Sequence, residues 1–89
     1  MKAIVTVVGK DQVGIIASVC NQLAQYNVNV LDISQTVMQG YFTMMMVVDA
    51  SQCSVPLSQL CGIMEETGVK MGLSIRLQRE DIFEAMHRI

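Results

Sequence analysis

Residues 9–31 constrain the fold of this chain more than any other segment. They read as the end of a strand closed by a glycine turn, then an amphipathic helix, then a second strand that opens on Asn29. Such a turn places several backbone N–H groups at the start of the helix, where the partial positive charge favours a carboxylate or another anion. No nucleophile, metal ligand or basic cluster stands beside the turn in the sequence. The segment therefore predicts a site that holds a small molecule without transforming it.

The side chains also predict the bounds of the first strand and helix. Residues 2–8 are apolar on both faces, which is typical of a strand buried on both sides, and Gly9 should end that strand. Asp11 is expected to cap a helix that stops at Asn27, because asparagine tolerates the left-handed conformation common just past a helix C-terminus. Spacings of three and four predict that this helix buries Ile16, Val19, Cys20, Leu23 and Ala24.

Two extended segments joined by a tight turn follow. Residues 28–39 are interrupted by polar side chains, which indicates an edge strand. The apolar positions of this strand are Val30 and, after a shift, Ile33 and Val37. The pair Gln39-Gly40 should form the turn, and residues 41–49 should form a third strand that is apolar on both faces.

A second helix and a fourth strand complete the pattern. Ser54 is a good N-cap, Pro56 suits the first turn, and the helix should stop at Gly68. The residues expected to be buried by this helix are Leu57, Leu60, Cys61 and Met64. Residues 71–78 then alternate between apolar and polar, as in a half-buried strand, and residues 80–89 predict a short closing helix.

The element order predicts an α+β fold of the ferredoxin-like type, βαββαβ, followed by the tail helix. Right-handed crossovers then give an antiparallel sheet in the order 4-1-3-2, with both main helices on one face. The side chains support this order independently. The first and third strands, which are apolar on both faces, fall in the centre of the sheet, and the more polar second and fourth strands fall at its edges.

Two helices can cover only one face of such a sheet. We assign to one face of the sheet Ile4, Val8, Phe42, Met44, Met46 and Val48. The alternate residues of the same strands, which point to the other face, are equally apolar. Only 16% of the residues are charged, against about 25% in a typical domain. The remaining face should be covered by the tail helix, by a second copy of the chain or by both. We expect both rather than the tail helix alone, which makes the protein a homo-oligomer.

Composition and spacing exclude several classes of function. The net charge is −2 and the six basic residues are scattered, so no basic face for nucleic acid is expected. The longest apolar stretch, residues 41–48, is too short to span a membrane, and the N-terminus lacks the pattern of a signal peptide. Three cysteines without Cys-x-x-Cys spacing argue against a disulfide framework, a zinc site or a metal cofactor. A cytoplasmic protein with reduced thiols is expected.

Two segments together resemble a known family. Residues 9–15, Gly-Lys-Asp-Gln-Val-Gly-Ile, and residues 29–33, Asn-Val-Leu-Asp-Ile, resemble the ACT domain, a small βαββαβ module that senses amino acids. The signature is most similar to the ACT domains of glycine-cleavage repressor proteins and of formyltetrahydrofolate deformylase, which begin with a similar Gly-x-Asp-x-x-Gly turn. The resemblance implies an ACT domain at residues 1–78 and a helical tail at residues 79–89.

The resemblance also implies a ligand site at a subunit interface. That site would combine the glycine turn of one chain with the second strand of the same or a neighbouring chain. Gly9, Asp11, Val13 and Gly14 match the turn, and Asn29 matches the asparagine that opens the strand. Gly14 would let a ligand approach the backbone, the first-turn N–H groups suit a carboxylate, and Asp11 and Asn29 could hold an amino group. The commoner family form has proline where Val13 stands, so this loop is less rigid.

Each of these residues also has a structural interpretation. Asp11 could serve only as a helix cap, Gly14 only in tight helix–sheet packing, and Asn29 only in bonds to local backbone groups. Catalysis is not expected, because no serine has a plausible histidine partner and no pair of placed carboxylates is visible.

Two functions remain. The first is a homodimeric sensor that binds an amino acid or related carboxylate and signals to another protein. The alternative is an interaction module whose ligand site is vestigial and whose apolar sheet face docks a partner protein.

Overall fold

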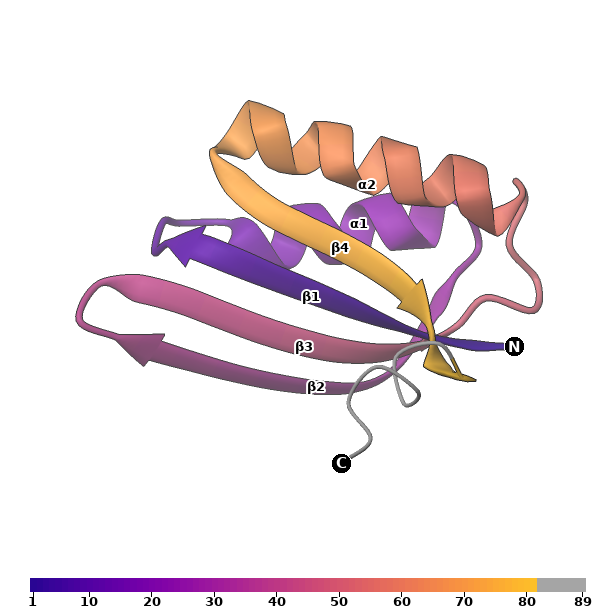
Figure 1. Ribbon diagram of the computed structural model, residues 1–89, viewed down its shortest axis with the longest axis horizontal. Coiled ribbons are helices and arrows are strands. Elements are labelled where there is room, and N and C mark those ends of the chain that lie inside the picture. Colours follow the sequence, from indigo (N-terminus) through magenta and orange to yellow (C-terminus); the bar gives the residue numbers. More distant parts are fainter. Residues whose placement is uncertain (82–89) are drawn as a thin grey trace.

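The computed structural model describes residues 1–81, and its elements follow in the predicted order βαββαβ (Figure 1). The elements are β1 (Lys2–Lys10), α1 (Ile15–Gln25), β2 (Asn29–Met38), β3 (Tyr41–Asp49), α2 (Leu57–Met71) and β4 (Leu73–Arg79). The strands form one antiparallel sheet in the order β2-β3-β1-β4, and both helices lie on one face of it. The predicted α+β ferredoxin-like fold and strand order 4-1-3-2 are confirmed. The tail helix predicted for residues 80–89 falls from residue 82 onward outside the described residues.

The hydrophobic core lies between the helices and the two central strands. In β1 and β3, Val5 pairs with Met46 and Val7 with Met44, and all four side chains are fully buried. The helices contribute the remaining layer, which contains Ile15, Val19 and Leu23 of α1 and Leu60 and Met64 of α2. β1 and β3 supply seven residues of this core, and their central position in the sheet follows from their apolar sequences.

One assignment of sheet faces was wrong. Ile4 pairs with Val47 and Val8 pairs with Thr43, so Ile4 and Val8 lie on the face opposite to the helices. Alternate residues of a strand point to opposite faces, and β1 carries apolar residues of both parities. On this open face Ile4 remains buried, whereas Val8 is largely exposed.

The helix starts also differ from the sequence prediction. The N-cap of α1 is Gly14 with φ of 90°, and the N-cap of α2 is Pro56; neither helix has a side-chain cap. Asp11 and Ser54 are not caps, because long-range bonds hold their backbones outside the helices: the N–H of Asp11 donates to the Gly40 carbonyl (2.9 Å) and that of Ser54 to the Tyr26 carbonyl (2.9 Å).

The start at Ile15 also changes the buried stripe of α1. Its buried residues are Ile15, Val19 and Leu23, spaced four apart. Ile16 and Cys20 are only partly buried, and Ala24 is exposed.

Two glycines that were expected to end elements lie inside them. β1 continues through Gly9, which pairs with Phe42 and Leu73, and a Cβ at Gly9 would collide with the Leu73 side chain. α2 continues through Gly68 to Met71 and ends at Gly72, which has φ of 73°. Both interior glycines are therefore explained by close packing against β4 rather than by chain termination.

The remaining turns follow the prediction. Asn27 has φ of 61° just past α1. Gln39 and Gly40 both have positive φ, at 51° and 82°, as a two-residue type I′ hairpin requires. β2 is an edge strand, and its register shifts between Val30 and Asp32, where a shift in the apolar pattern was predicted. Within residues 1–81, no helix is long and apolar enough to cross a membrane.

Candidate functional site

The glycine turn, residues 11–14, is held against two other elements. The N–H of Asp11 donates to the Gly40 carbonyl in the β2–β3 hairpin (2.9 Å). The Nε2 of Gln12 donates to the Met71 carbonyl at the end of α2 (2.9 Å). These two bonds fix the turn at the end of the sheet that carries the hairpin.

The start of α1 is open to solvent. A Cβ placed at Gly14 would meet no atom within 4 Å, and the Val13 side chain is fully exposed. Tight packing therefore does not explain Gly14, and its positive φ does. The first N–H groups of a helix have no acceptor within that helix, and no side chain caps those of α1. The Asp11 carboxylate, also exposed, has no partner among residues 1–81. The turn therefore presents helix N–H groups, which suit an anion, beside an exposed carboxylate, which suits a cation.

Asn29 lies at the other end of the sheet. It pairs with Asp49, which pairs with Lys2, whereas the turn follows Lys10. β1 is nine residues long, so at about 3.3 Å per residue roughly 26 Å separates its two ends. A single chain therefore brings Gly9, Asp11, Val13 and Gly14 together but leaves Asn29 apart from them.

The Asn29 side chain does not bond to local backbone groups. Its side chain is exposed and has no hydrogen-bond partner within the described part of the chain. The nearby Asn27 fills that role instead, because its Nδ2 donates to the Gln52 carbonyl (3.0 Å). Asn29 borders a small hollow of about 190 Å³ at the junction of α1 and β2.

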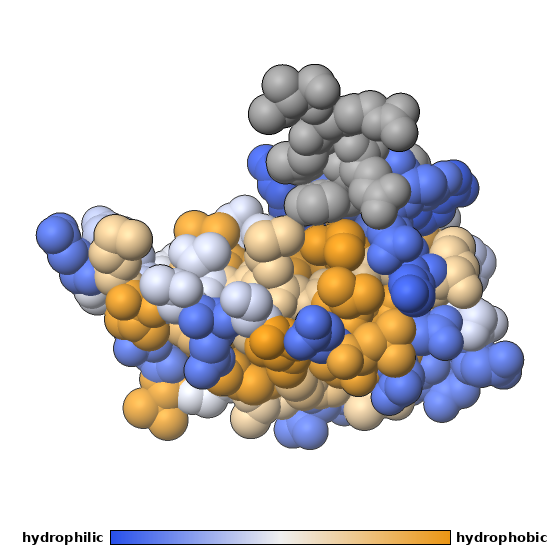
Figure 2. All heavy atoms as spheres, turned by 90° about the horizontal axis from the view of Figure 1, so that it is seen from below, coloured by the Kyte–Doolittle hydropathy of each residue, from blue (hydrophilic) through white to orange (hydrophobic). Residues whose placement is uncertain are grey.

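The β2 edge carries an apolar surface that the sequence prediction did not single out. Ile33 and Val37 pair with the core residues Met46 and Phe42, so they lie on the helix-facing side, yet they are 39% and 54% exposed. Figure 2 views the molecule from the side of β2, the lowest strand in Figure 1, and shows hydrophobic side chains gathered there. The helices do not extend over this strand. Ile33 and Val37 point to the same side of the sheet as the core residues, but no helix covers them. This combination was the signal that could have identified the surface.

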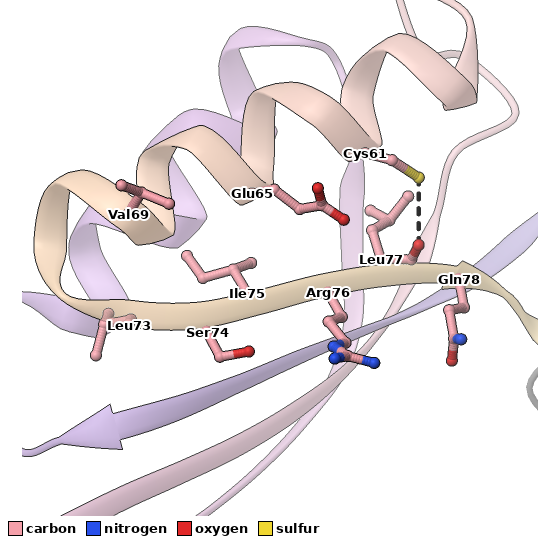
Figure 3. Close-up of a pocket in the computed structure, with 9 residues that line it drawn as sticks. All are labelled: Cys61, Glu65, Val69, Leu73, Ser74, Ile75, Arg76, Leu77 and Gln78. Carbon is pink, nitrogen blue, oxygen red and sulfur yellow. Dashed lines mark hydrogen bonds between the residues drawn. The ribbon is translucent and has the colours of Figure 1, made fainter.

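A second feature missed by the sequence prediction is a groove of about 610 Å³ between α2 and β4 (Figure 3). Cys61, Glu65 and Val69 line it from α2, and residues 73–78 line it from β4. Burial raises the pKa of the Cys61 thiol, and the negative charge of Glu65 raises it further. The protonated thiol donates to the Leu77 carbonyl (3.2 Å). Glu65 is exposed, and Figure 3 shows its carboxylate pointing from α2 toward β4.

The family follows from a match over nearly the whole length. The model of the ACT domain family matches residues 2–78. The chain belongs to the ACT domain family. ACT domains are, in general, small-molecule-binding regulatory modules. Among residues 1–81 of this ACT domain, no group of three or more His, Cys, Asp or Glu side chains could hold a metal ion.

Known relatives span the same length. A UPF0237 protein of Bifidobacterium longum is 57% identical over 88 residues, which is 99% of this chain and 98% of that protein. The solved structure of an ACT domain protein from Streptococcus pneumoniae is 45% identical, with a TM-score of 0.83 over 98% of each chain.

The predicted likeness to two larger proteins is confirmed for the fold. A formyltetrahydrofolate deformylase from Pseudomonas syringae superposes with a TM-score of 0.79 at 22% identity, over 88% of this ACT domain and 27% of that chain. A glycine cleavage system transcriptional repressor superposes with a TM-score of 0.74 at 21% identity, over 88% of this chain and 44% of that one.

Proposed function

We propose that this ACT domain protein is an amino-acid sensor that acts as a homodimer, with two copies paired along β2 and one ligand bound at each end of the interface. The observation that carries the proposal is the separation of the site residues in one chain. The glycine turn and Asn29 lie at opposite ends of the sheet, so a complete site needs a second copy.

The β2 edge has the properties of a pairing surface. Residues 33–38 contain neither charge nor proline, which are the usual means by which an edge strand avoids association. The register shift between Val30 and Asp32 limits regular pairing to residues 32–38, whose middle residue is Gln35. Two-fold antiparallel pairing about Gln35 places Ile33 opposite the partner's Val37, which removes both apolar side chains from water.

The same pairing completes the site. Because the two β2 strands run in opposite directions, Asn29 of the partner subunit reaches the end that carries the Gln39-Gly40 hairpin. That hairpin holds the glycine turn through the bond from Asp11 to Gly40. A ligand carboxylate would accept bonds from the first N–H groups of α1, and its ammonium would donate to the Asp11 carboxylate and to the partner's Asn29. Val13 would cover the ligand's apolar part.

A ligand held by two copies favours one arrangement of the dimer over others, which is the requirement for an allosteric signal. We propose that the signal passes to another protein and that the domain itself performs no catalysis. The three cysteines are free, which supports a cytoplasmic location with reduced thiols.

The test is thermal unfolding of the full chain against a panel of millimolar amino acids, with glycine and serine included. A ligand at 100 times its dissociation constant stabilises the folded state by about 2.7 kcal/mol, which shifts Tm by several degrees in a small domain. Asn29→Ala should remove the shift and leave the dimer intact in sedimentation equilibrium. Asn21→Ala, an exposed asparagine on α1, is the matched control and should keep the shift.

The second candidate, a docking module with a vestigial ligand site, is supported by the exposed Val13 in place of the commoner proline. It predicts no shift with any amino acid and no effect of Asn29→Ala. That result would overturn the sensor.

A further inference from the structure

We propose that Leu31 of one copy covers an apolar hollow beside the β2–β3 hairpin of a second copy, so that the β2 pairing is held on both faces of the sheet. This inference rests on the proposed dimer and adds a contact that neither the ligand site nor the contact between Ile33 and Val37 includes. Its basis is an exposed leucine, an apolar hollow, and the two-fold relation between them.

The hollow lies on the face of the sheet opposite to the helices. It has a volume of about 480 Å³ and is lined by Thr36, Met38, Gln39, Tyr41 and Thr43. Thr43 pairs with Thr36 and with Val8 of the open face, so the two threonines lie on that face. Met38 pairs with Tyr41, and their side chains are 68% and 58% exposed. A single copy therefore leaves the apolar wall of this hollow open to water.

Leu31 lies on the same face at the other end of β2. Val30 and Ile33, on either side of the register shift, pair with core residues and therefore point toward the helices. Regular alternation puts one residue between two that share a face, but the shift puts two there, Leu31 and Asp32. Both therefore lie on the open face, where the Leu31 side chain is 47% exposed.

The two-fold axis of the proposed dimer brings Leu31 to the hollow. Antiparallel pairing about Gln35 places Asp32 of the partner subunit opposite Met38. Leu31 of the partner subunit shares this position, because the register shift gives both residues the same neighbour on β3. Cβ atoms of directly opposed residues lie about 5 Å apart, which is within reach of a leucine side chain. Leu31 of the partner subunit therefore covers the outer side of the hollow at Met38.

A second copy is the occupant because one register satisfies both faces. On the helix side, pairing about Gln35 places Ile33 opposite the partner's Val37. On the open face, the same register places the partner's Leu31 against Met38, although the two contacts use different residues. Residues 33–38 carry no charge that this pairing would remove from water.

The first test is cross-linking of Leu31→Cys and Met38→Cys proteins, mixed and treated with a short bismaleimide. A cross-linked dimer should form in the mixture but in neither protein alone, because the two copies of residue 31 lie eight positions apart along the paired strands, roughly 26 Å. The separate proteins also report any reaction of the three native cysteines. A mixture of Leu31→Cys and Val69→Cys is the matched control and should give no cross-link, since Val69 is an exposed residue of α2.

A mixture of Ile33→Cys and Val37→Cys tests the β2 pairing itself. Cross-linking of this mixture, without cross-linking between positions 31 and 38, would overturn the Leu31 contact and leave the proposed dimer standing. Absence of cross-linking in both mixtures would overturn the contact and the dimer together.

The second test is the strength of the dimer in sedimentation equilibrium. Leu31→Ala should weaken association about 25-fold, which is about fivefold for each of the two equivalent contacts. Leu31→Met keeps an apolar side chain of similar volume and should stay within about twofold of the parent protein. Val69→Ala truncates an exposed apolar residue outside the interface and should have no effect. Equal association of Leu31→Ala and the parent protein would overturn the proposal.

Discussion

Gly68 shows how a single missing methyl group fixes the position of a helix on the sheet. It is buried within the last turn of α2, although glycine lowers the stability of a helix. A Cβ there would lie 2.7 Å from the Leu73 carbonyl oxygen and 3.2 Å from the Ile75 nitrogen. The helix therefore sits on the β4 backbone itself.

Gly68→Ala should destabilise the fold by about 1–3 kcal/mol, because the overlap is with backbone that cannot move aside. Gly62→Ala is the matched control in the same helix, since a methyl group added there would meet no atom within 4 Å. That change should stabilise by about 0.4–1 kcal/mol. Urea unfolding of both variants checks the pair, and equal effects at the two sites would contradict the packing argument.

Asp49 connects the end of β3 with the start of β1, at the end of the sheet opposite to the glycine turn. Its carboxylate accepts a bond from the Ser51 N–H (2.9 Å) and lies 3.6 Å from the N-terminal ammonium. The bond from Ser51 is the main reason that the pKa of Asp49 is lowered, and the N-terminal charge acts in the same direction.

A lowered native pKa means that the ionised form of Asp49 stabilises the fold above the carboxyl's ordinary pKa. This contribution is lost as pH falls through the native value. Asp49→Asn should therefore be less stable than the parent protein at pH 7, and the gap should close below pH ~4, around the ordinary aspartate pKa. Thermal unfolding of both proteins between pH 7 and pH 3 tests this, and a gap that persists at the acid end would refute the assignment.

At the scale of elements, the two edge strands differ in how they are protected. β2 carries exposed Ile33 and Val37 and no charge over residues 33–38, whereas β4 is lined by α2. The open face of the sheet offers a competing apolar surface around Val8 and Met45, which are 43% and 40% exposed. Either surface could hold a second copy, and single lysine substitutions separate them.

Val37→Lys should convert the proposed dimer to a monomer, because it places a charge in the interface proposed for β2. Met45→Lys, on the open face of β3, is the matched control and should leave the dimer intact. Sedimentation equilibrium measures both, and circular dichroism verifies that each variant is folded. Dissociation by Met45→Lys alone would assign the interface to the open face instead.

At the scale of the whole molecule, the strand order was predictable because the apolar pattern of each strand indicates whether one or both of its faces are buried. β1 and β3 are apolar at both parities, so only central positions suit them. The helix caps were not predictable, because Asp11 and Ser54 are held by bonds to Gly40 and Tyr26, far away in the sequence. The sequence proposed residues for a candidate site, but the prediction did not place Asn29 at the other end of the sheet from the glycine turn. That separation follows from the parallel course of β1 and β2, which the predicted strand order already implied but which was not applied to the site residues.

The strand order β2-β3-β1-β4 has a consequence for any dimer that joins through β2. It places the two β4 edges at the outer rims of a continuous eight-stranded sheet, seven strand spacings apart, or roughly 34 Å at about 4.8 Å per spacing. Such a dimer would bury the two β2 edges, which carry no charge over residues 33–38, against each other and leave at its rims the β4 edges, which α2 lines. Growth of the sheet by further strand addition would therefore stop at two copies.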